Sequence, residues 1–232
     1  EEEAMELVRM HHADGIILCA IENDWDKIRS YEQYGKVVVC NEYNEDTSIS
    51  TVRARQYEGF YKATEYLIGK NYQKIAYCTG SRGVMHQPNG MNIDSDRYSG
   101  YIEALAAHGM TADPNLNFTR AKTMDDGRRI LEEILKRENR PDAIIAGSDE
   151  VAAGILTEAI NQGIKVPEDL AIVGVDDQPI ASLLPIPLTT IRQPVQDEGM
   201  LAAKEIIRQL SEEPDDTVRK ELELELVIRQ SA

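Results

Sequence analysis

The sequence is short of cysteine, of basic residues and of long apolar runs, and each shortage excludes a class of protein. Three cysteines (Cys19, Cys40 and Cys78) are too few and too scattered for a disulfide framework, which favours a reducing compartment. The longest apolar runs have about six residues, far fewer than a membrane span needs, and no basic-then-apolar export signal opens the chain. We therefore expect a cytoplasmic protein without a membrane partner.

The balance of charge also excludes partners. The 232 residues contain 25 Lys and Arg against 41 Asp and Glu, a net charge of -16. Neutralising phosphates requires a surplus of Lys and Arg. This sequence is therefore not expected to bind DNA or an anionic membrane by itself.

Motifs for catalysis and for metal binding are missing as well. The sequence has no GxSxG nucleophile elbow, no GxxxxGK[ST] phosphate loop and no GxGxxG after a strand. It also has no Cys-x-x-Cys or His-x-x-x-His spacing. We expect no catalytic residues, no metal site and no cofactor, and hence no enzyme.

What the sequence does contain is a regular alternation of short apolar runs and amphipathic segments. The apolar runs predict strands at 16–19, 37–40, 74–78, 142–146 and 170–175. Helices are predicted near 53–70, 95–108, 125–137, 149–162 and 194–210. This order is typical of parallel sheets with right-handed crossovers, and two α/β lobes in tandem fit it better than one sheet. The alternating ELELELVI of residues 221–228 predicts one half-exposed strand at a sheet edge.

The apolar run at 170–175 ends in two carboxylates, Asp176 and Asp177. Ligands of open α/β sheets bind at the carboxyl ends of the strands, so Asp176 is a candidate for binding a polyol or a base edge. The alternative is that both carboxylates only cap a helical turn at 179–183. The residues themselves leave the two interpretations open.

Two further junctions between a loop or strand and a helix are candidates for ligand contacts. Arg97 lies at the mouth of a helix, where free N–H groups and a guanidinium suit an anion or vicinal hydroxyls. The alternative is an ordinary cap followed by an exposed arginine. Ser148 and Asp149 lie at the second junction, and either of them can serve only as a cap.

The three cysteines each lie at the carboxyl end of a predicted strand, in ILCA, VVCN and AYCT. If the strands are neighbours, the thiols lie along one edge, where a redox or metal role is conceivable. Buried cysteine more often serves as a small hydrophobic residue. The structural interpretation is therefore the simpler of the two.

Several motifs in order resemble the LacI/GalR family of bacterial transcription repressors, in its effector-binding core. The motifs are ADGIIL, IGKNYQKIAY, DRYSGYIEAL, PDAIIAGSDEVAAGIL, NQGIKVPEDLAIVGVDD and PLTTIRQP. The resemblance implies an α/β, two-lobe, periplasmic-binding-protein-like type I fold with parallel sheets flanked by helices. It also implies that the N-terminal lobe is incomplete at its start.

The resemblance assigns the chain to two lobes. Residues 1–78 and about 194–220 are expected in the N-terminal lobe, and residues 79–193 and about 221–232 in the C-terminal lobe. The crossings between lobes are expected near 79–94, 187–194 and 213–221.

The resemblance also implies a set of site residues. The expected effector contacts in the interlobe cleft are Arg97, Asp176, Ser148, Asp149, Glu58 and Lys122. Gln193 and Val195 match positions near the hinge, and Asp177 is left as a helix cap. Lys122 stands where many sugar-responsive members have an aromatic residue, which favours an anionic ligand.

The function that the resemblance implies is a sensor that closes over a small effector, such as a sugar or sugar phosphate, and changes operator affinity. Its partners would be a second copy of the chain and operator DNA, which a headpiece absent from this sequence would contact. The alternative from another class is a stand-alone solute-binding receptor of a transport system.

Overall fold

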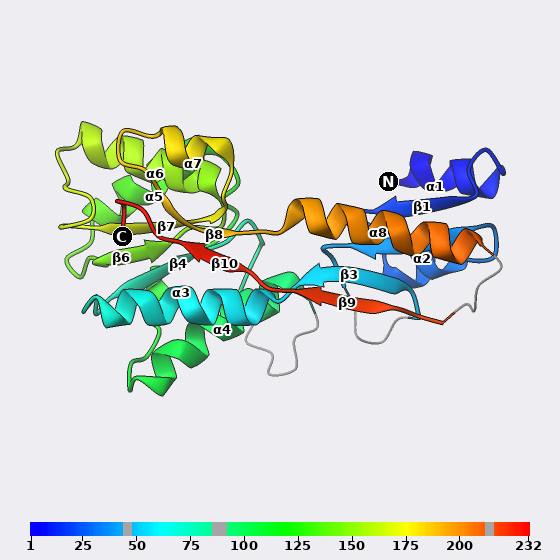
Figure 1. Cartoon of the computed structure of the whole chain (residues 1–232). Helices are drawn as coiled ribbons and strands as arrows, with labels where there is room; N and C mark the ends of the chain where they lie inside the picture. The colour runs from blue at the N-terminus through cyan, green and yellow to red at the C-terminus, as the bar shows by residue number, and fades with distance from the viewer. Residues whose placement is uncertain (44–47, 85–91, 212–215) are drawn as a thin grey trace. The chain divides into compact units, whose positions relative to one another are not determined.

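The computed structural model describes residues 1–43, 48–84, 92–211 and 216–232. The chain forms two compact units, each with its own sheet (Figure 1). The first unit contains Glu1–Arg55 and Pro194–Glu223, and the second contains most of the intervening chain together with Leu224–Ala232. No helix in the described ranges is long and apolar enough to cross a membrane.

The sheet of the first unit has four parallel strands in the order β1-β2-β3-β9. The strands are β1 (Gly15–Leu18), β2 (Lys36–Cys40), β3 (Ser50–Ala54) and β9 (Arg219–Leu222). The helices of this unit are α1 (Glu2–Arg9), α2 (Trp25–Ser30) and α8 (Val195–Leu210).

Both faces of this sheet are covered, which explains the apolar run of β2. Val37 and Val39 pack in one cluster with Met5 of α1 and Ile28 of α2. The alternate residues of β2 point the other way, into a cluster with Ala202 of α8. Because successive side chains of a strand point to opposite faces, β2 contributes residues to the apolar clusters on both faces of the sheet.

The sheet of the second unit has six strands in the order β10-β8-β7-β6-β4-β5. The strands are β4 (Ile75–Cys78), β5 (Asn117–Phe118), β6 (Ala143–Ile145), β7 (Ala171–Asp176), β8 (Thr189–Arg192) and β10 (Glu225–Val227). All neighbours are parallel except β10, which is antiparallel to β8. The helices are α3 (Gln56–Gly69), α4 (Ile93–Ala107), η1 (Pro114–Leu116), α5 (Met124–Leu135), α6 (Asp149–Asn161) and α7 (Pro179–Leu183).

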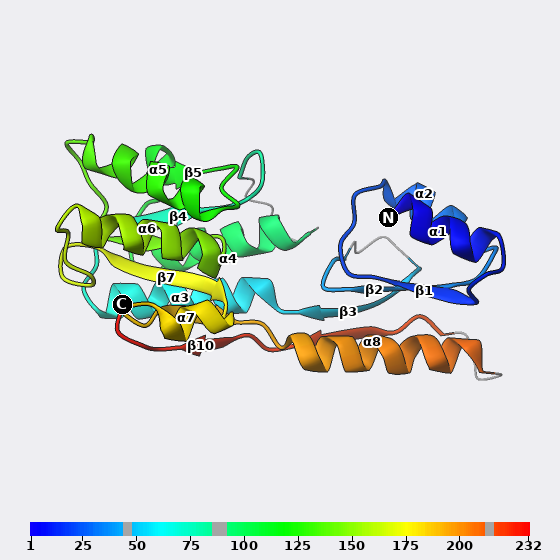
Figure 2. The same cartoon turned by 90° about the horizontal axis from the view of Figure 1, so that it is seen from above.

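Helices cover both faces of this second sheet as well (Figures 1 and 2). Helices α5 and α6 pack over Ala76 and Cys78 in one apolar cluster. On the opposite face, Tyr77 contacts Phe60 of α3 and stacks on Tyr101 of α4. The parallel strands are buried on both sides, as the apolar runs predicted.

The units differ from the expected lobes most in one segment of the chain. Residues 56–78 were assigned to the N-terminal lobe, but the structure groups them with the second unit. The reason is long-range pairing, since β4 lies between β5 and β6 in the second sheet. Periodicity predicted the strand correctly and carried no information about its neighbours. The expected crossing at 79–94 lies partly in residues 85–91, outside the described residues.

The single edge strand predicted at 221–228 is two strands. β9 is the edge strand of the first sheet and β10 that of the second. Leu224, between these two strands, is buried against Gly59 of α3. A Cβ added at Gly59 would lie 2.4 Å from the Cδ1 of Leu224. The buried Leu224 therefore lies between the end of β9 and the start of β10. The chain passes from the first unit to the second after Glu223, and not within 213–221 as expected.

Candidate functional site

Four polar side chains of the second unit form a continuous hydrogen-bonded row, which we call the Arg97–Asp176 row. Arg97 Nε donates to Gln56 Oε1 at 2.8 Å, and Gln56 Nε2 donates to Gln193 Oε1 at 3.1 Å. Gln193 Nε2 then donates to Asp176 Oδ1 at 2.8 Å. The structure thus connects Arg97, Gln193 and Asp176, three residues expected in the site. It adds Gln56, which the sequence analysis missed.

Burial fixes the middle of the row and leaves its charged ends accessible. Gln56 is fully buried and Gln193 is 9% exposed, whereas Arg97 and Asp176 are half-buried. Each amide accepts on the arginine side and donates on the carboxylate side, so the two amide dipoles run from the cation to the anion. A row satisfied in this way holds both charged groups in place.

A glycine positions Arg97. A Cβ on Gly100 would lie 2.3 Å from the carbonyl oxygen of Tyr57, so only glycine lets α4 approach α3 this closely. The guanidinium of Arg97, one turn earlier, therefore lies over the Phe60 ring at 5.3 Å and within reach of Gln56. The outer fork of the guanidinium suits a carboxylate, a phosphate or vicinal hydroxyls.

The backbone at the end of β7 is strained. Asp176 and Asp177 have φ angles of +104° and +53°, in a region that residues other than glycine rarely adopt. Such strain persists only where the surroundings impose it, and it is concentrated at functional sites. Here it turns the two consecutive carboxylates in different directions.

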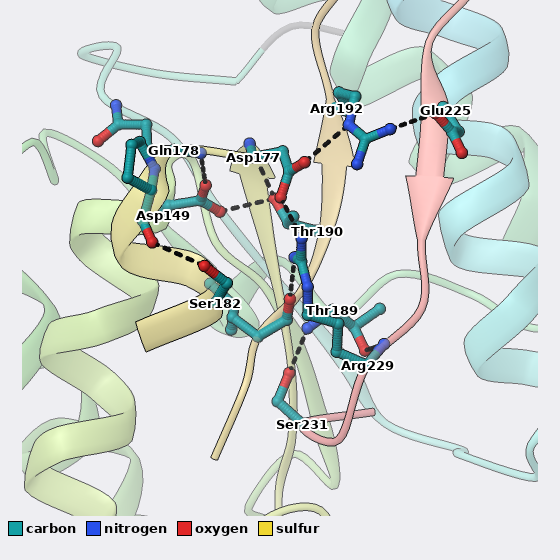
Figure 3. Close-up of polar contacts among 12 residues, drawn as sticks. Asp149, Asp177, Gln178, Ser182, Thr189, Thr190, Arg192, Glu225, Arg229 and Ser231 are labelled. Carbon is teal, nitrogen blue, oxygen red and sulfur yellow. Dashed lines mark hydrogen bonds and ion pairs between the residues drawn. The ribbon is translucent and has the colours of Figure 1, made fainter. Parts of the chain in front are cut away.

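Asp177 is not a helix cap, so that prediction was wrong. The N-cap residue of α7 is Gln178, without a side-chain cap bond. Asp177 instead binds Arg192 at 2.7 Å and Arg229 at 2.6 Å (Figure 3). Burial alone would raise its pKa, but the hydrogen bonds from the two guanidinium groups lower the pKa overall. Both arginines are distant in sequence, which is why local patterns favoured a cap.

Ser148 and Asp149 differ in their roles. Ser148 caps α6 by accepting from the backbone N–H of Val151 at 3.3 Å, as the simpler interpretation predicted. Asp149 is fully buried and accepts from the Thr190 hydroxyl at 2.6 Å and the Gln178 N–H at 2.7 Å (Figure 3). Burial raises the pKa of Asp149 to about 6. Its carboxylate faces the protein interior and joins α6 to β8.

The remaining expected residues lie outside the row. Lys122 is exposed, with its aliphatic stem over Gly80 in the loop after β4. Glu58 is exposed on the first turn of α3, two residues after Gln56. Val195, at the start of α8 in the first unit, is 65% exposed. Among the described residues, no group of three or more His, Cys, Asp or Glu is placed to hold a metal ion.

Comparison with known proteins gives a family and related sequences for this chain. A family model described as a periplasmic binding protein-like domain matches residues 64–232. The NTD biosynthesis operon regulator NtdR of Bacillus subtilis is 35% identical over 91% of this chain and 62% of its own length. The HTH-type transcriptional repressor CytR of Escherichia coli is 28% identical over 100% of this chain and 66% of its own length. The chain therefore spans less than two thirds of these curated relatives.

Solved structures give the same result. A LacI family transcriptional regulator from Lactobacillus casei with bound glucose is 28% identical, with a TM-score of 0.85 over 100% of this chain and 83% of that one. A complex of the transcriptional regulator CelR with cellobiose is 29% identical, with a TM-score of 0.87 over 100% of this chain and 69% of that one. The chain belongs to the periplasmic-binding-protein-like domain family, among the regulators of the LacI/GalR family that its motifs resemble.

Proposed function

We propose that this chain is the ligand-sensing part of a transcriptional regulator and binds a small polar effector such as a sugar or sugar phosphate. The observation that carries the proposal is the Arg97–Asp176 row, which presents a cation and a carboxylate at the carboxyl end of β7. Glucose and cellobiose are bound in the two similar structures. These bound sugars support a carbohydrate as the class of ligand.

The chemistry of the row suits a polyol. Hydroxyl groups both donate and accept hydrogen bonds, so Asp176 can accept from them while the guanidinium of Arg97 donates to adjacent oxygens. Lys122 adds a positive charge that would favour a phosphorylated or carboxylated sugar. Ser148 and Glu58 remain candidate contacts, whereas we assign Asp149 to holding Thr190 and the backbone at Gln178.

The regulatory part of the proposal is thermodynamic linkage. An effector changes DNA affinity only if it binds one arrangement of the protein more tightly than the other. Gln193 and Val195 flank the point where the chain passes from the second unit to the first, so we assign them to the hinge. We place the protein in the cytoplasm as a homodimer, with operator DNA bound through a segment outside this sequence.

Calorimetric titration with sugars, sugar phosphates and nucleosides tests the ligand class. With a ligand that binds, Arg97→Ala and Asp176→Asn should each lower the affinity by about tenfold or more, because a charged hydrogen bond is lost. Arg128→Ala is the matched control, since Arg128 pairs with Asp125 on the exposed face of α5. Unchanged affinity in both site variants would remove the row from the site.

A further inference from the structure

Two cysteines of the first unit lie side by side at the ends of neighbouring strands. In the parallel register of β1 and β2, Leu18 is opposite Val39, so Cys19 and Cys40 follow as the next pair. Neighbouring strands lie about 5 Å apart, which is within the Cα separation that a disulfide spans. Both cysteines are reduced in this structure.

The two thiols also point to the same face of the sheet. Val38 and Cys40 pack in the cluster beneath α8, and Ile17 of β1 packs against that cluster. Leu18 belongs to the opposite cluster, so the alternation of the strand directs Cys19 back toward the α8 face. The Cys19 thiol is also near enough to Cys40 to contribute to the raised pKa of the Cys40 thiol.

The environments of the two thiols differ in a way that assigns an order of reaction. Cys19 is exposed, whereas Cys40 is only 6% exposed. Burial, together with the neighbouring Cys19 and Glu198, raises the pKa of Cys40 to about 12. Cys40 therefore stays protonated, and Cys19 is the sulfur that an oxidant in solution meets first.

We propose that Cys19 and Cys40 are a reversible modification site, which a peroxide oxidises to an intramolecular disulfide. The Cys19 sulfur attacks one peroxide oxygen, the O–O bond breaks, and a sulfenic acid and water form. The Cys40 sulfur then attacks the Cys19 sulfur, the S–O bond breaks, and hydroxide leaves with the Cys40 proton as a second water. The two sulfurs lose two electrons and hydrogen peroxide gains them, and a small thiol reverses the reaction by exchange.

The consequence for the fold is local. A disulfide would tie the loop that follows β1 to the end of β2, beside the first turn of α8, where Glu198 lies. Glu198 is 3% exposed and its Oε1 has no hydrogen-bond partner among the described residues. This edge of the sheet thus holds the pair of thiols beside a buried acid.

Counting thiols in the chain tests the proposal without any effector, so its result is independent of the proposed function. After treatment with hydrogen peroxide, the number of free thiols should fall from the three in the sequence to one, and dithiothreitol should restore all three. Mass spectrometry of a tryptic digest should show peptide 10–27 joined to peptide 37–53.

Single variants provide the controls. Cys78→Ser should lose the same pair of thiols, because Cys78 is fully buried in β4 of the second unit. Cys19→Ser, at an exposed position, and Cys40→Ala, which keeps a small apolar side chain, should each abolish the linked peptides. A disulfide between two copies of the chain, terminal oxidation of Cys19 alone, or consumption of Cys78 would each overturn the proposal.

Discussion

Two buried glutamines determine how the charges of Arg97 and Asp176 are held. Gln56 and Gln193 are 137 positions apart in the chain, yet they share the hydrogen bond at the centre of the row. A buried amide that loses its partner costs the desolvation of that group, so the row is sensitive to any single deletion. The glutamines thus act as positioning residues between the two charged ends.

Gln193→Ala should lower the free energy of unfolding by about 1–3 kcal/mol, because Gln56 and Asp176 each lose a hydrogen-bond partner. Urea unfolding measures this change. Gln178→Ala is the matched control, since Gln178 is exposed and its backbone N–H, which the substitution keeps, makes its bond to Asp149. Equal stability of the two variants would show that the row contributes nothing to folding.

Asp149 should make stability depend on pH in an unusual direction. Its pKa is about 6 in the folded state, against about 3.9 in an unfolded chain, so the folded state favours the protonated form. The contribution of Asp149 to the free energy of unfolding is complete below about pH 4 and is lost as the pH rises through about 6. In Asp149→Asn this titration is absent.

Unfolding free energies of the wild type and Asp149→Asn, measured from about pH 4 to about pH 7, give the contribution of this group. The wild type should lose up to about 3 kcal/mol relative to the variant as the pH rises. The difference between the two proteins cancels the other carboxylates, such as Asp177, whose lowered pKa acts in the opposite direction. A difference that stays constant with pH would contradict this assignment.

At the scale of secondary-structure elements, close helix packing places the site. Gly100 brings α4 against α3, and this contact carries Arg97 to Gln56. Gly59, also on α3, packs against Leu224, the buried residue between β9 and β10. Helix α3 is therefore held by two glycine contacts that neither helix periodicity nor helix propensity requires.

Gly100→Ala should destabilise the protein by about 1–3 kcal/mol, because the added Cβ would lie 2.3 Å from the Tyr57 carbonyl oxygen and force the helices apart. It should also weaken binding of the effector by displacing Arg97. Gly69→Ala is the control on α3, since a Cβ there meets no atom within 4 Å. Thermal unfolding compares the two, and equal melting temperatures would show that α4 adjusts without cost.

At the scale of the whole molecule, each unit has its own sheet and its own core. The C-terminal segment belongs to the second unit, where Ser231 Oγ accepts from the Thr189 N–H at 2.8 Å and donates to the Ile172 carbonyl at 2.6 Å. Figure 3 shows Ser231 and Arg229 beside β8. The last residues therefore complete the second core.

Ser231→Ala should destabilise the second unit by about 1–3 kcal/mol, because two buried backbone groups lose their partner. Hydrogen exchange followed by mass spectrometry should show faster exchange in β7 and β8 and no change in β1 and β2. Ser182→Ala, at an exposed position of α7, should change neither unit. Faster exchange in both units of the Ser231 variant would show that they unfold as one.

The sequence by itself determined the local features of this protein. The apolar runs and amphipathic periods depend only on nearby residues, so they predicted β1, β2, β4, β6 and β7 and the helices α3 to α6 and α8. They missed β3, which the predicted helix at 53–70 overlaps, and they left a cap at Ser148 or Asp149 as one of two interpretations. The motifs likewise indicated the family and three members of the Arg97–Asp176 row.

Only the tertiary structure decided which distant residues meet. It placed β4 in the second sheet, divided residues 221–228 between two sheets, and gave Asp177 the partners Arg192 and Arg229 in place of a helix cap. It also buried Asp149 and brought Gln56 to Gln193. The physical reason is that burial and hydrogen bonding depend on neighbours in space, which no local period or motif encodes.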